Sequence, residues 1–223
     1  MPSITMPPDP VSRQASAPIE GRRLKRALAA LAAADEDLAR ALAAVGPPPP
    51  RHRPAGFASL LDIILAQQVS TASARAIATR LAAALDGAIE PERLLGLDDG
   101  ALAAVGFSRA KMRYGRGLAR AVATGTLDLA ALAGLDDEAA IAALVGLDGI
   151  GRWSAEIYLL TSLHRTDILP ADDLALLIGY QRLTAAAERP RANALRLRAE
   201  AWRPWRSIAA RLLWHYYARG PKP

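Results

Sequence analysis

Apolar residues recur at helical spacing through most of this 223-residue chain, and this periodicity restricts the fold more than any other feature. The first such stretch covers residues 22–45 and is ended by Gly46 and a run of four prolines. Others follow at about 57–68, 70–86, 99–105, 108–124, 137–146, 151–164, 172–187, 191–201 and 204–219. No stretch alternates between apolar and polar residues as a half-buried strand does. The sequence therefore predicts an all-α fold.

The local signals for helix ends agree with this periodicity. Ser70 and Ser108 each precede a helical stretch and are N-cap candidates. Gly106, Gly125 and Gly146 each stand where a stretch ends. Residues 1–20 differ from the rest, because they hold five prolines and little apolar periodicity, and we expect a disordered N-terminal arm there.

The composition excludes several kinds of chemistry. The chain has no cysteine, so it can form no disulfide, no thiolate zinc site, no cysteine-ligated iron–sulfur cluster and no thiol nucleophile. It has no apolar run of roughly 18 residues and no export signal, so we expect no membrane association and a cytoplasmic location. Hydrophobic residues make up 52% of the chain, which is ample material for a buried core.

The chain is basic, with a net charge of +6 and a pI near 10.1. Such a charge suits a polyanionic partner such as nucleic acid. However, only three of the 28 basic residues are lysines, and alanine is very abundant. This bias also arises from the base composition of a genome, so charge alone decides little about the partner.

A glycine-punctuated turn joins two predicted helices at residues 144–155. Gly149 and Gly151 would let the backbone turn sharply and approach another molecule, while Leu147 and Ile150 would anchor the turn in the core. The free N–H groups at the start of the second helix would then form an anion site. An ordinary tight turn between two helices fits the same residues, so the spacing of these glycines leaves both interpretations open.

The segment Leu-Asp-Gly-Ile-Gly-Arg-Trp-Ser-Ala at 147–155 resembles the hairpin of helix-hairpin-helix DNA glycosylases, which usually reads Leu-Pro-Gly-Ile-Gly-x-x-Thr-Ala. Asp148 replaces the usual proline and Ser154 the usual threonine. The resemblance implies a two-lobed helical fold, in which residues 21–223 form one glycosylase domain of two intertwined lobes with the active site in the cleft between them.

The same resemblance assigns roles to the hairpin. Gly149, Gly151 and Arg152 would grip the DNA backbone without reading its sequence. The backbone carbonyls of Val145, Leu147 and Ile150 would hold a monovalent cation, Na⁺ or K⁺, and no other cofactor is expected.

Two adjacent aspartates, Asp172 and Asp173, open a predicted helix after Pro170. Plain helix capping explains two such residues in an unknown helical protein. Their distance from the hairpin is nevertheless the second mark of the glycosylase family. The family pattern makes Asp173 the catalytic carboxylate, whereas Asp172 would be the N-cap.

Two further segments resemble DNA-3-methyladenine glycosylase II, the alkylpurine DNA glycosylase family. In the segment 56–70, Gln68 matches the wedge that fills the place of an extruded nucleotide; a plain glutamine at a helix end is the alternative. In the segment 201–214, Trp214 matches a pocket wall, whereas Trp202, Trp205 and Arg206 are expected to pack and orient. Arg109 and Lys111 match residues that flank the DNA, with a solvated first helical turn as the alternative.

The predicted substrate pocket is aromatic. Trp153 stands where relatives that also cleave the strand carry a Schiff-base lysine, so the resemblance implies no lyase activity. Trp153 and Trp214 could stack on a cationic alkylated purine, although both could also be core residues. Ile157 and Leu174 stand where the bacterial enzyme has pocket tyrosines, which leaves the substrate range open.

These observations predict a monofunctional DNA glycosylase that flips out and excises alkylated purines, of the 3-methyladenine and 7-methylguanine type, in base excision repair. Its partner would be double-stranded DNA with damaged bases, and we expect a monomer associated with the bacterial nucleoid. Two alternatives stay open: a non-catalytic helix-hairpin-helix DNA-binding protein, and a glycosylase for oxidised or deaminated bases.

Overall fold

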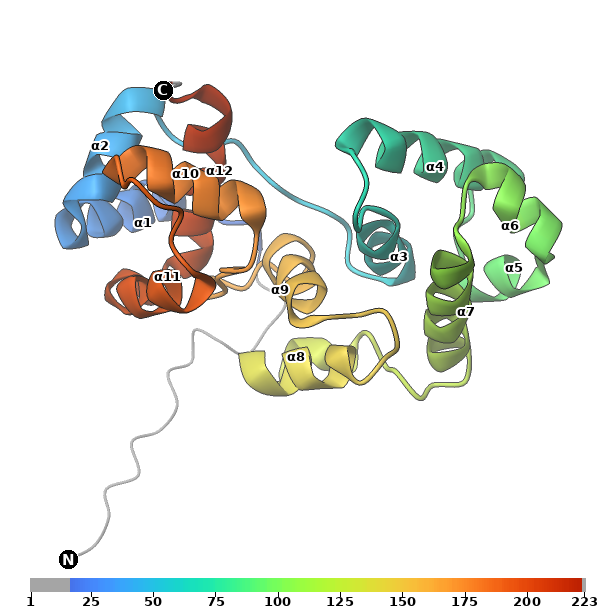
Figure 1. Cartoon of the computed structure of the whole chain (residues 1–223). Coiled ribbons are helices and arrows are strands. Elements are labelled where there is room, and N and C mark those ends of the chain that lie inside the picture. The colour runs from blue at the N-terminus through green and yellow to red at the C-terminus, as the bar shows by residue number, and fades with distance from the viewer. Residues whose placement is uncertain (1–16, 222–223) are drawn as a thin grey trace, which may run out of the picture.

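The computed structural model describes residues 17–221 and confirms the all-α fold, since no strand occurs within them (Figure 1). None of the helices in this range is long and apolar enough to cross a membrane. The elements are α1 (Gly21–Ala34), α2 (Glu36–Val45), α3 (Phe57–Leu65), α4 (Thr71–Ala84), α5 (Pro91–Gly96), α6 (Asp99–Val105), α7 (Arg109–Ala123), η2 (Ala131–Gly134), α8 (Asp137–Val145), α9 (Arg152–Thr161), α10 (Leu174–Thr184), α11 (Ala192–Arg198), η3 (Ala199–Trp202) and α12 (Arg206–Arg219).

The helices form two groups, and one group combines helices from both ends of the sequence. Helices α1 and α2 pack against α10 and α12, so the first helices of the chain lie beside the last ones. Helices α3 to α7 form the second group, and α9 packs on α3 and α8. In Figure 1 the first group lies on the left and the second on the right, joined by the extended segment between α2 and α3. This is the two-lobed arrangement that the sequence predicted.

The single helix predicted at residues 22–45 is in fact two helices, because Asp35 breaks it. The buried Asp35 carboxylate accepts hydrogen bonds from the backbone N–H groups of Asp37 and Leu38 and so caps α2. It also accepts a hydrogen bond of 2.7 Å from Nε1 of Trp202 and forms an ion pair with Arg198. One carboxylate therefore ties the first two helices to the C-terminal part of the chain.

Most other helix boundaries follow the sequence signals. The side chains of Ser70 and Ser108 cap α4 and α7, and Gly106 ends α6 with a φ of 102° in the left-handed region. The pattern missed the short elements α5 and η2. Helix α5 begins with Pro91, a residue suited to the first helical position, but it is too short to show a period.

The predicted disordered arm is partly corrected. Residues 1–16 lie outside the described residues, whereas residues 17–20 are placed against the domain. Ile19 is buried, and its carbonyl accepts a hydrogen bond from Arg211. The Glu20 carboxylate lies 2.7 Å from Nε2 of His52. The sequence did not reveal this contact, because a single apolar residue in a proline-containing segment shows no periodicity.

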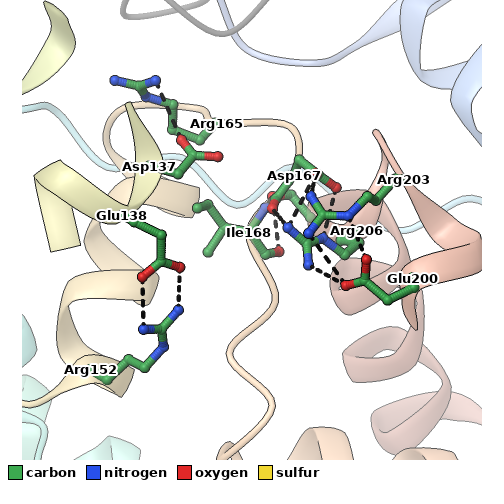
Figure 2. Close-up of polar contacts among 10 residues, drawn as sticks. Asp137, Glu138, Arg152, Arg165, Asp167, Ile168, Glu200, Arg203 and Arg206 are labelled. Carbon is green, nitrogen blue, oxygen red and sulfur yellow. Dashed lines mark hydrogen bonds and ion pairs between the residues drawn. The ribbon is translucent and has the colours of Figure 1, made fainter. Parts of the chain in front are cut away.

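The loop between α9 and α10 is fixed by contacts with residues around η2 and with the residues at the start of α12 (Figure 2). The Arg206 guanidinium binds the Asp167 carboxylate at 2.8 Å, and Arg203 binds the same carboxylate. Ser207 receives a hydrogen bond from the Ile168 N–H and donates one to its carbonyl. The buried Arg165 donates to three carbonyls around η2. This loop is therefore fixed before it reaches Asp172 and Asp173.

A buried carboxylate on α9 is unfavourable in its charged form. Glu156 is 3% exposed, and its Oε1 accepts a hydrogen bond from Nε of Arg152, while Oε2 has no partner among the described residues. Burial raises the pKa of Glu156 to about 7, against the lowering effect of Arg152. Arg152 is also bound by the exposed Glu138 (Figure 2).

This carboxylate predicts a pH dependence of stability. The pKa of Glu156 is about 7 in the folded chain against an ordinary 4.5, so the native state binds the proton more tightly and stability falls as pH rises between these values. Wild type should lose about 2–3 kcal/mol of unfolding free energy between about pH 5 and pH 8 because of Glu156. The variant Glu156→Gln should not show this loss. Urea unfolding at several pH values measures it.

The matched control is Glu138→Gln, which removes the exposed carboxylate bound to the same arginine. The pKa of Glu138 is lowered by its hydrogen bond with Arg152, so this variant should keep the wild-type pH profile above pH 5. Identical profiles for wild type and Glu156→Gln would show that Glu156 is ionised throughout this range.

Candidate active site

Asp173 stands at the N-terminus of α10 and is held by three N–H groups. Its Oδ1 accepts a hydrogen bond of 2.9 Å from the backbone N–H of Leu176, which caps the helix. The same oxygen accepts 2.9 Å from Nε1 of Trp214 on α12, and Oδ2 accepts 3.0 Å from Nε1 of Trp153 on α9. The half-buried carboxylate therefore joins three helices and has a fixed orientation.

The N-cap prediction for Asp172 is wrong, because Asp173 caps the helix. The backbone N–H of Asp173 donates to the Pro170 carbonyl at 2.9 Å, and this turn brings the second aspartate to the cap position. Asp172 is exposed and forms an ion pair with Arg196 instead. The candidate catalytic residue thus also provides the helix cap that the sequence had assigned to its neighbour.

Asp173 lies where two openings meet. The larger has a volume of about 1290 Å³ and runs along the hairpin, the turn between α3 and α4, and the first turns of α7 and α10. The smaller, of about 430 Å³, is hereafter called the base cavity. Its lining includes Trp153, Ile157, Trp214 and Arg51 as well as Asp173. Leu174, predicted with them, is 56% exposed and borders the larger opening instead.

The two glycines of the hairpin differ in whether the fold requires a glycine at their position. Gly149 has a φ of 86°, and a Cβ there would lie 2.1 Å from Cγ of Tyr114, so only glycine fits. Gly151 has a φ of −85°, and apart from its chain neighbours no atom lies within 4 Å of where a Cβ would stand, so the fold itself does not require glycine there. The predicted anchor residue Ile150 is buried, and its N–H donates to the Leu147 carbonyl.

Two glutamines at the end of α3 have different surroundings. Gln67 belongs to the segment 56–70 but was assigned no role from the sequence; its Nε2 donates to the Gly149 carbonyl and to Oγ of Ser154, both at 2.9 Å. It ties the end of α3 to the hairpin. Gln68 borders the larger opening and has a φ of 57°, which is unusual for a residue with a side chain. Its predicted role as the wedge stays a prediction.

The basic residues predicted to bind DNA lie in three settings. Arg109 is exposed on the first turn of α7. Lys111 is buried, and its Nζ donates to the Leu65 carbonyl at 2.6 Å; burial also lowers its pKa. This corrects the expected phosphate contact, because the ammonium holds the end of α3. The guanidinium of Arg152 is engaged by Glu138 and Glu156.

The predicted cation site consists of neutral oxygens. Val145, Leu147 and Ile150 belong to one turn, where the Leu147 carbonyl already accepts the Ile150 N–H at 3.1 Å. The carboxylate of Asp148 forms an ion pair with Arg113 at 2.8 Å on the surface. Within residues 17–221, no cluster of three or more His, Cys, Asp and Glu side chains could hold a metal ion.

One residue of the base cavity had no signal in the sequence. Arg51 follows the proline tract, and its guanidinium carbon lies 4.5 Å from the ring centroid of Trp214. The linker has no helical period, so nothing in the pattern placed this residue beside Asp173.

The sequence profile described as HhH-GPD superfamily base excision DNA repair protein matches residues 61–206. The chain therefore belongs to this superfamily.

Among similar proteins is DNA-3-methyladenine glycosylase 1 of Schizosaccharomyces pombe, 31% identical over 161 residues that cover 71% of each chain. DNA-3-methyladenine glycosylase 2 of Escherichia coli is 31% identical over 72% of this chain and 56% of its own. A solved structure of the S. pombe 3-methyladenine DNA glycosylase in complex with abasic DNA aligns with a TM-score of 0.79 over 85% of this chain and 95% of that one.

The relatives differ in length. The chain spans 31% of a Mycobacterium tuberculosis relative named "Probable bifunctional transcriptional activator/DNA repair enzyme AlkA", with which it is 35% identical over 163 residues.

The two hairpin glycines give a testable contrast. Gly149→Ala places a methyl group against the Tyr114 ring, at a positive φ that side chains rarely adopt, and should destabilise the chain by roughly 1–3 kcal/mol. Gly151→Ala should leave the melting temperature near that of wild type, since its Cβ meets open space. Thermal unfolding measures both.

The same pair distinguishes a fold requirement from a binding requirement. If a DNA backbone approaches Gly151 closely, Gly151→Ala should weaken binding of duplex DNA roughly tenfold while the fold is unchanged. Wild-type affinity of this variant at low salt would contradict a close backbone approach at the hairpin.

Proposed function

We propose that this chain is a monofunctional DNA glycosylase that hydrolyses the N-glycosidic bond of alkylated purines, of the 3-methyladenine and 7-methylguanine type, in double-stranded DNA. The observation that carries the proposal is the Asp173 carboxylate, fixed by two indole N–H groups where the hairpin-lined opening meets the base cavity. The similarity to proteins named DNA-3-methyladenine glycosylase supports the substrate class.

The chemistry required is cleavage of the bond between C1′ of deoxyribose and the base nitrogen. As this bond breaks, its electron pair goes to the base and positive charge develops on the sugar. A carboxylate beside C1′ stabilises that charge, and it can orient the water whose oxygen adds to C1′ while its proton is lost. Asp173 would act in this way.

The three donors prepare Asp173 for this role. An ionised carboxylate has about four acceptor positions, and three are used by Trp153, Trp214 and the Leu176 N–H. One remains for the sugar or the water. Because all three donors fix the direction of the carboxylate, little reorganisation is needed when the sugar becomes cationic.

The target base must leave the helical stack to reach Asp173. The base cavity, with a volume of about 430 Å³, would receive it, and the larger opening would receive the DNA backbone. Gln68, at the edge of that opening, would fill the vacancy in the stack. The free N–H groups at the start of α9 would bind a phosphate, since Gly151 offers no side-chain cap.

We further propose that the carbonyls of Val145, Leu147 and Ile150 bind Na⁺ or K⁺, because neutral oxygen ligands in one turn suit a hard monovalent cation. No other cofactor enters the proposed reaction. We also propose that the protein acts on DNA as a monomer, at the nucleoid.

The central prediction concerns the two aspartates. Wild type should release 3-methyladenine and 7-methylguanine from duplexes that each contain one lesion, and it should release 8-oxoguanine much more slowly. We expect Asp173→Asn to remove release, because an amide cannot stabilise the sugar cation, while affinity for lesion DNA changes only a few fold. Single-turnover formation of abasic sites measures the effect.

Asp172→Asn is the matched control. Asp172 forms only an exposed ion pair with Arg196, so this variant should keep excision within a few fold and lose little stability. Exchanged phenotypes would show that Asp172 is the catalytic residue. DNA binding without excision of any lesion would favour a non-catalytic DNA-binding protein, and a preference for 8-oxoguanine would favour a glycosylase for oxidised bases.

The absence of lyase chemistry gives a separate prediction. Trp153 stands at the family's Schiff-base position, and an indole cannot form an imine. Borohydride should therefore trap no covalent complex with DNA during active excision, and the product strand should stay intact until alkali treatment. Lys111 is the one lysine among the residues that line the two openings. If any complex is trapped, the variant Lys111→Ala shows whether this amine formed it. Efficient trapping in wild type would contradict a monofunctional enzyme.

A further inference from the structure

Arg51 is a residue of the base cavity that the proposed mechanism does not use. It lies directly after the proline tract of residues 47–50, in the segment that joins α2 to α3. Its guanidinium stacks on Trp214, 4.5 Å from the ring centroid, and Trp214 binds Asp173 through its N–H. Arg51 is therefore connected to the candidate catalytic carboxylate through one side chain, that of Trp214.

Arg51 is exposed, and the donors of its guanidinium bind no acceptor of the described residues. A guanidinium carries five N–H donors in a planar fork. Among the described residues no acceptor takes any of them, and the stacking on Trp214 is the contact that places the side chain. By contrast, Arg53 at the same cavity is paired with Asp62. Arg51 thus offers free donors to whatever enters the cavity.

The charge of Arg51 opposes a cationic base. A ring face attracts one cation, and on Trp214 that cation is already Arg51. A 7-methylguanine base that entered the cavity would meet the like charge of this guanidinium. The Asp173 carboxylate attracts both cations, since it also raises the pKa of Arg51 against the stronger lowering effect of burial. A base that stacked on this face of Trp214 would have to displace Arg51.

A neutral purine would be treated in the opposite way. Its carbonyl oxygen and ring nitrogens are acceptors that fit a planar fork of donors. When the C1′–N bond of a neutral lesion breaks, the electron pair leaves with the base as negative charge. Hydrogen bonds from a nearby guanidinium stabilise this leaving anion without transfer of the guanidinium proton. A cationic lesion leaves as a neutral base and gains nothing from this.

We propose that Arg51 broadens the lesion range: it favours excision of neutral purine lesions that present oxygen or nitrogen acceptors, and so reduces the advantage that cationic alkylated purines gain from their weaker glycosidic bonds. This inference rests on the proposed function for its reaction, but the preference itself is a property of the cavity. The cation–π gain expected from Trp214 for a cationic base is then reduced by the protein's own arginine.

The kinetic test compares one neutral and one cationic lesion. Single-turnover rates are measured on duplexes that contain hypoxanthine or 7-methylguanine, for wild type, Arg51→Ala and Arg51→Lys. Arg51→Ala should lower the hypoxanthine rate relative to the 7-methylguanine rate by about tenfold or more. Arg51→Lys keeps the charge without the planar fork, so its ratio should lie between the other two.

The control is Arg182→Ala. Arg182 also stacks on an aromatic ring, 4.9 Å from the centroid of Tyr217, but it lies away from the base cavity. Its removal should leave the ratio of the two rates within about twofold of wild type, whereas an equal shift in both variants would mean that the ratio reports general loosening of the fold.

A binding test does not depend on catalysis. Calorimetric titration with N-methylquinolinium, a permanent aromatic cation, and with hypoxanthine as the free base measures the preference of the cavity. Arg51→Ala should bind the cation about tenfold more tightly and hypoxanthine more weakly than wild type. If wild type excises no alkylated purine but this preference changes as stated, the proposed function fails and the role of Arg51 stands. Unchanged ratios in both tests, with active wild type, would overturn the role of Arg51.

Discussion

The hydrogen bonds between one carboxylate and two indoles are the interaction on which the rest of this structure depends. Asp173 begins α10, Trp153 lies in the first turn of α9, and Trp214 lies near the middle of α12. These helices belong to different parts of the fold, so the carboxylate has its geometry only when both groups of helices are assembled. A half-buried carboxylate with three N–H donors is costly to leave unpaired, so the same bonds also stabilise the fold.

The hairpin and the carboxylate are mechanically connected through α9. Gly149 packs its backbone flat on Tyr114, and Gln67 binds the carbonyl of this glycine together with Ser154. These contacts fix where α9 begins, and Trp153 is the second residue of that helix. On the other side, the loop that carries Asp173 is fixed by Arg206 and Asp167. The hairpin proposed to bind the DNA backbone and the carboxylate proposed to act on the sugar are therefore both fixed through α9 and the loop that follows it.

The parts that could be predicted are those with a local pattern. Helical periodicity predicted the all-α class, and the resemblance of the hairpin and the following aspartates to helix-hairpin-helix DNA glycosylases assigned Asp173 as the candidate carboxylate. What could not be predicted depends on contacts between distant segments. Nothing local shows that Lys111 turns inward to the Leu65 carbonyl, or that Arg51 in an aperiodic linker reaches Trp214. The helix break at Asp35 did have a local signal, since acidic residues follow it as they do at many helix starts.

The role of the two indole donors is tested most directly by single-turnover excision of 3-methyladenine by Trp153→Phe, Trp214→Phe and the double variant. Phenylalanine keeps an aromatic ring but removes the N–H, so each single variant should lose roughly tenfold or more in rate. Trp205→Phe, which changes an indole that has no bond to Asp173, should keep the wild-type rate. Wild-type rates in both single variants would contradict the claim that these hydrogen bonds prepare Asp173 for catalysis.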